Sequence, residues 1–153
     1  MKKRLFFLIV PSVFILDRLT KAQIIRAFAE GQSRAVWPGV FHLTRVNNTG
    51  AAFGILKGAA PFLMGVTWAC AVLLAVYLFW SGVKKRERLW SLDGVAWALV
   101  LAGALGNGFD RWRYGYVVDF LDFRVWPVFN VADAAISVGV FLILLKFLTG
   151  RRS

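Results

Sequence analysis

Four long apolar runs, separated by shorter polar segments, set the pattern along the chain. The runs fall at about 5–16, 59–83, 92–105 and 131–148. A membrane-spanning helix needs roughly 20 mainly apolar residues. The second and fourth runs reach this length by themselves, whereas the first and third must continue into polar residues. The pattern predicts a single membrane domain, 1–153, with four transmembrane helices at about 5–27, 59–83, 92–112 and 131–148.

The segments between the first and second helices, 28–58, and between the third and fourth, 113–130, have a different pattern. From residue 37 to 56, apolar residues are interspersed with polar ones, and Pro38–Gly39 and Asn48–Gly50 have the composition of turns. This pattern predicts a short strand or two. The expected fold is a mainly α membrane protein, a four-transmembrane-helix bundle with a small β-rich extracytoplasmic cap.

Basic residues outnumber acidic ones by 19 to 8, which gives the chain a net charge of +11. They cluster at Lys2–Arg4, at Lys84–Arg88 and from Lys146 to Arg152, which four helices would place on one side of the membrane. Lys and Arg mark the cytoplasmic side, so both termini are expected inside, with 28–58 and 113–130 outside. Anionic membrane phospholipids are therefore the expected partner of these clusters, and nucleic acid is not.

A cleaved signal peptide is an alternative interpretation of the first apolar run, because Lys2–Arg4 precede it. However, no cleavage site of small residues follows Leu16, and charged residues come instead. The sequence therefore favours a first helix that is retained.

Charged residues inside the first predicted helix form the stretch "DRLTK". Asp17 and Lys21 are four residues apart, so they share a helix face and can pair. An ordinary ion pair near the outer interface, with Arg18 and Lys21 extended towards headgroups, is one interpretation. Ionisable residues inside a membrane are also candidates for function, and we expect this pair to brace a site.

A second polar group, "GNGFDR", ends the third predicted helix. The small residues Gly103 and Gly106 allow another helix to approach closely. Asn107 and Arg111 are four residues apart and share a helix face. Taken alone, Asp110 and Arg111 are best interpreted as a surface pair at a helix end, which adds little stability.

Three of the eight acidic residues lie within "YGYVVDFLDFRVWPVFNVADAA", residues 114–135. Asn130 is placed to cap the fourth helix, which makes Asp133 a capping-box residue stabilised by the helix dipole. Asp119 and Asp122 lie in a stretch that, if extended, turns them to opposite faces. An inward-facing Asp119 has no cation beside it in the sequence, and so its burial needs another explanation.

Two carboxylates that share one proton supply that explanation, because close like charges cannot both ionise cheaply. One carboxylate can take a proton from water while the other donates to a carbonyl oxygen, which is what amide hydrolysis requires without a metal. The helix dipole favours ionised Asp133, and apolar neighbours favour the proton on Asp119, although either could be the base. The single His42 offers no metal-binding group, and no metal or cofactor is expected.

Together these motifs resemble the lipoprotein signal peptidases, the bacterial signal peptidase II family of aspartic peptidases in the cytoplasmic (inner) membrane. The motifs that carry the resemblance are "DRLTK" (Asp17–Lys21), "NNTGAAFG" (Asn47–Gly54), "GNGFDR" (Gly106–Arg111), "GYVVDFLDF" (Gly115–Phe123) and "FNVADAAIS" (Phe129–Ser137). Five motifs in this order, on four predicted spans, cover nearly the whole chain. Two departures from relatives are the short segment 123–129 and Gly108, where a bulkier residue is often found.

The resemblance implies that Asp119 and Asp133 are the catalytic dyad. It implies substrate-binding or dyad-supporting roles for Asp17, Lys21, Asn48, Gly54, Asn107, Asp110, Arg111 and Asn130. The implied substrate is a prolipoprotein whose cysteine already carries diacylglycerol, cleaved just before that cysteine to release the signal peptide. The resemblance also implies inhibition by the peptide antibiotic globomycin, and we expect a monomer.

Two other function classes fit some of these residues. An ion-coupled carrier could use Asp17, Lys21 and Asp133 as a charge relay, but it predicts polar residues throughout the bilayer depth. The second predicted helix has no charge at all, which argues against a carrier. A membrane assembly protein needs no dyad, and it predicts normal lipoprotein processing after both Asp119 and Asp133 are replaced.

Overall fold

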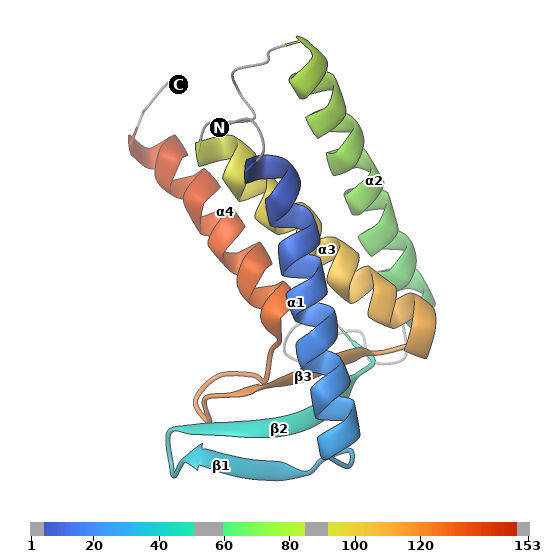
Figure 1. Ribbon diagram of the computed structural model, residues 1–153, viewed down its shortest axis with the longest axis vertical. Helices are drawn as coiled ribbons and strands as arrows, with labels where there is room; N and C mark the ends of the chain where they lie inside the picture. Colours follow the sequence, from blue (N-terminus) through green and yellow to red (C-terminus); the bar gives the residue numbers. More distant parts are fainter. Residues whose placement is uncertain (1–4, 51–59, 85–91, 150–153) are drawn as a thin grey trace.

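The computed structural model describes residues 5–50, 60–84 and 92–149. Within these ranges the chain forms four long helices, close to where the apolar runs predict them: α1 (Leu5–Ala27), α2 (Ala60–Lys84), α3 (Leu92–Tyr114) and α4 (Val131–Thr149). The beginning of α1 and the end of α4 lie at one end of the molecule, and a small sheet lies at the other (Figure 1).

Helix α3 is the centre of the bundle, since it packs against α1, α2 and α4. Its contact with α4 is close because glycines line it. A Cβ added at Gly103 would lie 2.3 Å from the carbonyl oxygen of Ala132, and one added at Gly139 would lie 2.6 Å from that of Ala96. These distances leave no room for a side chain, so the expectation that small residues permit close packing is confirmed here.

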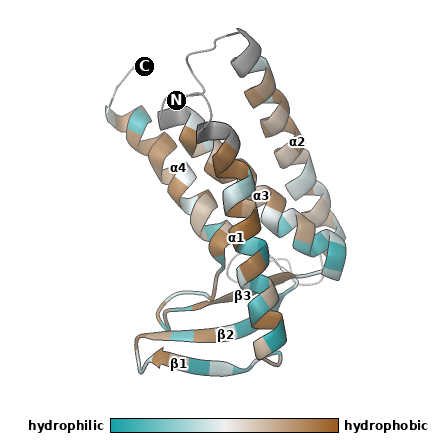
Figure 2. Ribbon diagram, in the orientation of Figure 1, coloured by the Kyte–Doolittle hydropathy of each residue, from teal (hydrophilic) through white to brown (hydrophobic). Residues whose placement is uncertain are grey.

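The outer surfaces of the helices are apolar. Two stretches within the described residues, Pro61–Trp80 and Val131–Thr149, are long and apolar enough to cross a membrane. Only 11% and 17% of their most apolar parts are buried. A core helix of a soluble protein would instead be mostly buried. In α1 and α3, polar residues gather towards the sheet end (Figure 2). Cys70 is exposed on α2.

The sheet is antiparallel, in the order β1–β2–β3, with strands β1 (Ser33–Trp37), β2 (Phe41–Asn48) and β3 (Val117–Asp122). The strands lie across the end of the helical bundle (Figure 1). The turn predicted at Pro38–Gly39 joins β1 to β2, and Gly39 adopts a φ of 75° that favours glycine. The first strand begins before the predicted segment at residue 37, and the pairing of β2 with β3 has no local signal.

The sheet is attached to α1 by apolar packing and by one arginine. Ile24 of α1 packs with Val118 and Phe120 of β3, and all three are buried. Arg45 of β2 donates hydrogen bonds to the carbonyl oxygens of Ile25 and Phe28, at 3.3 and 2.8 Å. Carbonyls at the end of a helix lack intrahelical donors, so Arg45 satisfies the end of α1 and fixes the position of β2.

Candidate active site

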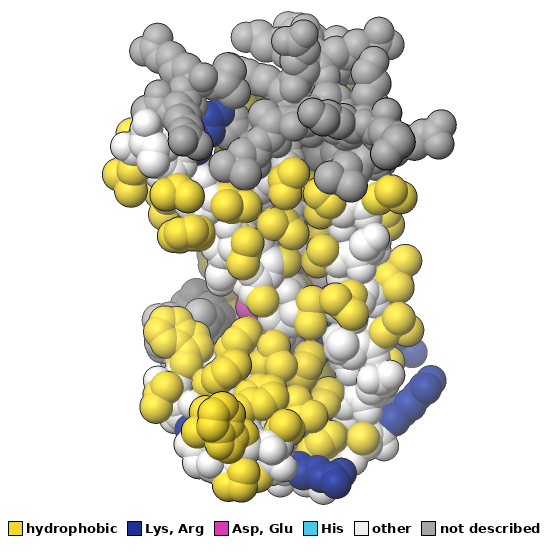
Figure 3. Space-filling model, turned by 60° about the vertical axis from the view of Figure 1, so that its left-hand side comes forward, with side chains coloured by type: hydrophobic (Ala, Val, Ile, Leu, Met, Phe, Trp, Pro, Cys, Tyr) yellow, Lys and Arg dark blue, Asp and Glu magenta, His cyan; other side chains and the backbone are white. Residues whose placement is uncertain are grey.

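A cavity of about 950 Å³ lies between the sheet and helices α3 and α4. Asp119 from β3 and Asp133 from α4 both line it, together with Asn48, Asn107 and Arg111. In the space-filling view the surface is hollowed between the helices and the sheet, and an acidic side chain is visible there (Figure 3). Thus two acids that are far apart in the sequence face the same space.

Asp133 and Asn130 form the capping box that the sequence predicts. The backbone N–H of Asp133 donates to Oδ1 of Asn130 at 2.9 Å, and the backbone N–H of Asn130 donates to Oδ2 of Asp133 at 3.2 Å. These reciprocal bonds satisfy free amides at the start of α4 and hold the Asp133 carboxylate in the first turn. The other oxygen, Oδ1, accepts a bond of 2.7 Å from Nδ2 of Asn107.

Asp119 is buried, with 2% of its surface exposed. Its Oδ1 accepts a hydrogen bond from Nδ2 of Asn130 at 2.7 Å, and its Oδ2 accepts one from Nδ2 of Asn48 at 2.9 Å. Burial, together with the charge of Asp133, raises the pKa of Asp119 from 3.8 to about 7, although the two amide donors act in the opposite direction. Asn130 therefore contacts both acids.

The amide of Asn107 can point only one way. Its Oδ1 accepts hydrogen bonds from Nζ of Lys21 at 3.0 Å and from Nδ2 of Asn130 at 3.1 Å. Both partners are donors, so the oxygen must face them and the NH2 group must face Asp133. Lys21 thereby orients the Asn107 NH2 group that donates a hydrogen bond to Asp133.

Behind the cavity, α1 and α3 share a cluster of four charged side chains. Lys21 Nζ lies 3.1 Å from Asp17 Oδ2 and 2.8 Å from Asp110 Oδ2, and Arg18 bonds to the same two acids. Asp17, Lys21 and Asp110 are buried. The predicted pairing of Asp17 with Lys21 is thus confirmed, but the interpretation of Lys21 as extended towards headgroups is wrong.

Asp110 also differs from its simplest sequence interpretation. It is completely buried and pairs with Arg18 and Lys21, so the surface pair with Arg111 is wrong. Two buried acids with one lysine would leave a negative charge, and Arg18 balances it. Counting the charges within the predicted helices could have indicated this partner, since a buried charge without a counter-charge is costly.

The charge cluster also holds the two elements that carry the cavity acids. Asp17 Oδ1 accepts a hydrogen bond from the backbone N–H of Ala132 at 3.1 Å, in the first turn of α4. Asp110 Oδ2 accepts one from the backbone N–H of Val118 at 3.1 Å, next to Asp119. Asp17 therefore contacts α4 directly and Asp110 contacts β3 directly, while Lys21 bonds to both acids. The bracing role expected for Asp17 and Lys21 stays a prediction.

Arg111 extends from α3 along the cavity wall and donates to the carbonyl oxygen of Gly50 at 3.1 Å. Asn48 Oδ1 accepts the Gly50 N–H at 2.9 Å, so a turn forms where the sequence predicts it. Gly54, the remaining candidate, lies outside the described residues.

Asp122 lies on the same strand as Asp119 but faces away from the cavity, as strand alternation predicts. Its partners are the Thr44 hydroxyl at 2.7 Å and Arg124 Nη1 at 2.9 Å. Burial acts to raise the pKa of Asp122, but the hydrogen bonds from Thr44 and Arg124 outweigh it and lower that pKa below its usual value. The two acids of β3 thus have opposite environments.

Sequence reasoning missed the apolar part of the cavity wall. Besides the polar candidates, the wall includes Val46, Asn47, Thr49, Val117, Phe123, Trp126, Pro127, Val128, Phe129, Ala134, Ile136, Ser137 and Val138. The motif stretches include some of these residues but not Val46, 126–128 or Val138. Nothing else in the sequence marks the apolar ones, because apolar side chains are common throughout this chain. In the part of the chain that the structure describes, no three His, Cys, Asp or Glu side chains are grouped to hold a metal ion.

The chain that forms this cavity matches a known protein family. A family model described as signal peptidase (SPase) II matches residues 9–149. The chain belongs to the signal peptidase II family. Signal peptidase II enzymes are aspartic peptidases that remove signal peptides from prolipoproteins, so the chain is a hydrolase. Both cavity acids lie within the matched residues.

Relatives of the signal peptidase II family match along nearly their whole length. The lipoprotein signal peptidase of Gloeothece citriformis is 45% identical over 149 residues, covering 95% of this chain and 90% of that protein. The one of Moorella thermoacetica is 44% identical over 144 residues, covering 94% and 92%. Two solved structures described as bacterial membrane enzymes are 35% and 34% identical, with TM-scores of 0.82 and 0.77. They cover 94% of this chain each, and it covers 87% and 92% of theirs.

Proposed function

We propose that Asp119 and Asp133 are the catalytic dyad of this signal peptidase. The observation that carries the proposal is their shared surroundings: both line one cavity, and Asn130 contacts both. Each carboxylate receives its hydrogen bonds from amide groups, not from a cation. Neutral donors hold the acids in place while a proton can still be exchanged between the dyad and a substrate.

The surroundings assign a starting role to each acid. Asp119, whose pKa is raised to about 7, holds the proton below that pH. Asp133 lies in the first turn of α4, where the helix dipole favours a negative charge, so it serves as the base. A water molecule gives a proton to Asp133 as its oxygen attacks the scissile carbonyl carbon, and Asp119 protonates the carbonyl oxygen. Asp133 then gives this proton to the amide nitrogen as the C–N bond breaks. One hydroxyl of the tetrahedral intermediate returns its proton to Asp119, which restores the dyad with one proton.

The substrate is a prolipoprotein that already carries diacylglycerol on its cysteine, and cleavage falls just before that cysteine. Arg111, Asn48 and Gly54 are proposed to bind the substrate backbone, with Arg111 and Asn48 supported by their place on the cavity wall. The lipid chains can remain between the apolar helices, so the membrane contributes to substrate binding. Globomycin is expected to compete for the same cavity.

All four helices are proposed to cross the inner membrane as a monomer, with both termini cytoplasmic and the cavity near the outer face. The charges of α1 and α3 are compatible with this, because Asp17, Lys21 and Asp110 are buried within the bundle and leave apolar surfaces for lipid. Their mutual pairing also argues against the carrier alternative. Membrane phospholipids therefore surround the helices.

The test replaces Asp119 or Asp133 by Asn and measures cleavage of a lipid-modified precursor by the purified enzyme in phospholipid vesicles. Both variants should lose activity to background. Asp122→Asn is the matched control, because the same change on the other face of β3 should leave cleavage intact. Substantial cleavage by either dyad variant, with the control active, would exclude the two-carboxylate mechanism. Globomycin inhibition identifies cleavage that comes from this enzyme.

A further inference from the structure

The end of the sheet farthest from α1 has large apolar side chains exposed to the outside. Trp37 and Val40 flank the β1–β2 turn and are 66% and 42% exposed. Val125 and Trp126 lie in the β3–α4 loop and are 92% and 60% exposed. We call these four residues the sheet tip. Exposed apolar groups of this size are unusual in a water-facing loop and indicate an interaction surface.

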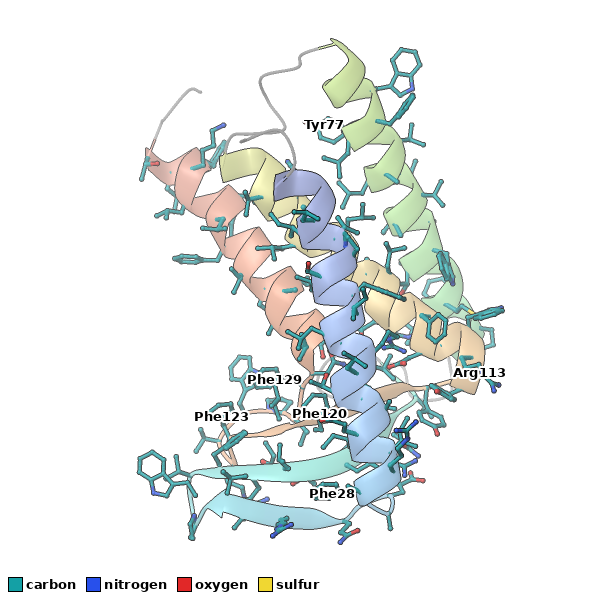
Figure 4. All side chains as sticks on the ribbon, viewed as in Figure 1. Phe28, Tyr77, Arg113, Phe120, Phe123 and Phe129 are labelled. Carbon is teal, nitrogen blue, oxygen red and sulfur yellow. The ribbon has the colours of Figure 1, made fainter. Side chains whose placement is uncertain are left out.

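Packed aromatic side chains support the sheet tip. Phe123 packs between Phe41 of β2 and Phe129, with ring centroids 4.9 and 5.9 Å apart (Figure 4). Phe129 also exchanges backbone hydrogen bonds with Leu121 at 2.8 and 3.1 Å. The β1–β2 turn and the β3–α4 loop are therefore joined through three aromatic rings, so that the tip forms one surface.

The position of the tip indicates what covers it. The strands lie across the bundle, and the sheet extends sideways past the start of α4 (Figure 1). On the face shown in Figure 3, hydrophobic side chains extend from the helices, past the hollow, onto the sheet end. Helix α4 has exposed apolar side chains at Val138 and Phe141. The tip therefore continues the surface that faces lipid in the proposed arrangement.

Charges around the tip fit a bilayer surface as well. Within residues 33–48 and 117–129, the only acids are Asp119 and Asp122, and both are buried. The exposed charged side chains there are Arg34 and Arg124. Basic side chains beside exposed Trp are the pattern of segments that lie at the headgroup level of a membrane.

We propose that the sheet tip inserts into the outer leaflet at the boundary between headgroups and acyl chains. Its partner is the phospholipid bilayer itself. Trp126 belongs to both the tip and the cavity wall, so insertion holds the mouth of the cavity against the lipid. A cysteine that carries diacylglycerol is then presented at the depth of the dyad. The proposal rests on the transmembrane arrangement proposed above, but not on the identity of the catalytic residues.

The test places a fluorophore on a single cysteine at Val125→Cys in a Cys70→Ala background, in vesicles of phosphatidylglycerol and phosphatidylethanolamine. Glu30→Cys, at the exposed α1–β1 turn, is the matched control position. Lipids with a nitroxide near the headgroup should quench residue 125 at least about twofold more than residue 30, and aqueous iodide should show the reverse order. Asp133→Asn protein should give the same result, since insertion needs no catalysis.

Equal iodide quenching at both positions would overturn the proposal. Shielding of the fluorophore at position 125 from both quenchers, followed by quenching when the protein is diluted, would also overturn it. That result would mean that a second copy of the chain covers the tip. A second readout is Val125→Asp, which should raise KM for the vesicle-embedded precursor several-fold while kcat stays unchanged. An unchanged KM, or a fall confined to kcat, would contradict a role of the sheet tip in membrane insertion.

Discussion

This enzyme has two polar regions, the charge cluster and the cavity acids, and their aspartates have different kinds of partner. In the charge cluster, Asp17 and Asp110 each pair with Arg18 and Lys21, so two acids and two cations balance. In the proposed dyad, the hydrogen bonds that Asp119 and Asp133 receive from the described residues all come from amides. Both regions are buried or nearly so, and they lie one side chain apart, through Asn107.

This difference in partners distinguishes carboxylates that hold the backbone in place from carboxylates that can exchange a proton. A carboxylate matched by cations is a fixed charge that can position backbone, as Asp17 and Asp110 do for α4 and β3. A carboxylate held by neutral donors keeps its geometry without a permanent counter-charge, so a proton can come and go. Burial beside a second acid then raises the pKa of Asp119 to about 7, which is suited to proton transfer near neutral pH.

The strongest test of this comparison makes one substitution, Asp→Asn, at all four positions. Asp17→Asn and Asp110→Asn should lower the free energy of unfolding by about 3–5 kcal/mol, because a buried cation loses its partner. Asp119→Asn and Asp133→Asn should cost at most about 1–2 kcal/mol, since one amide donor loses an acceptor. Denaturant unfolding in detergent micelles measures both. Equal losses at all four sites would remove the distinction.

Asn130→Ser separates the cap that Asn130 forms on α4 from the hydrogen bond that its side-chain amide donates to Asp119. Serine is a good N-cap, so the start of α4 should keep its stability within about 1 kcal/mol. The donor to Asp119 Oδ1 is lost, and kcat should fall roughly ten- to a hundredfold. The alkaline limb of the pH–rate profile should also move to higher pH, because a bond that favours ionised Asp119 is gone. If kcat and stability fell together, Asn130 would be a cap alone.

The pH dependence should differ in sign between the two acids of β3. The folded pKa of Asp119 is raised, so its contribution to stability is complete below 3.8 and is lost as pH rises through about 7. Activity should fall about tenfold per unit above that value as Asp119 loses its proton. The pKa of Asp122 is lowered, so its contribution is present above 3.8 and is lost as pH falls. Melting temperatures of Asp119→Asn and Asp122→Asn against the parent, across pH, check both signs.

Two glycines on α3 give a smaller and more local test. A Cβ at Gly106 would lie 2.8 Å from Asp17 Oδ2, whereas one at Gly108 would lie 3.4 Å from Thr67 Cγ2. Gly106→Ala should therefore disturb the charge cluster and cost about 1–3 kcal/mol. Gly108→Ala should be neutral or stabilising by up to about 1 kcal/mol, because alanine favours helix. If Gly108→Ala proved as harmful, α3 rather than the cluster would limit stability.

Local patterns in the sequence predict much of this molecule. The apolar runs predict the helices because burial in lipid or protein requires uninterrupted apolar length. The four-residue spacing of Asp17 and Lys21 predicts their pairing, and the "FNVAD" stretch predicts the capping box. Each of these depends on residues within one or two turns of each other, where geometry follows from spacing alone.

Contacts between segments that are distant in the sequence could not be predicted in this way. Nothing near Asn48 indicates that β2 pairs with β3 and brings it to Asp119. Arg18 looks like a lipid-facing residue until Asp110, 92 positions away, is placed beside it. The apolar cavity wall is equally hidden, because Val, Phe and Trp occur throughout the chain. Such contacts depend on the packing of whole elements, which no short pattern encodes.

The bond from Ala132 to Asp17 joins positions 115 residues apart and has a consequence for biosynthesis. A chain still emerging from the ribosome holds Asp17 long before α4, with Asp133, is made. If Asp119 and Asp133 are the dyad, we expect hydrolysis only after the last helix has inserted and docked against the first. Chains truncated before α4 should therefore be inactive.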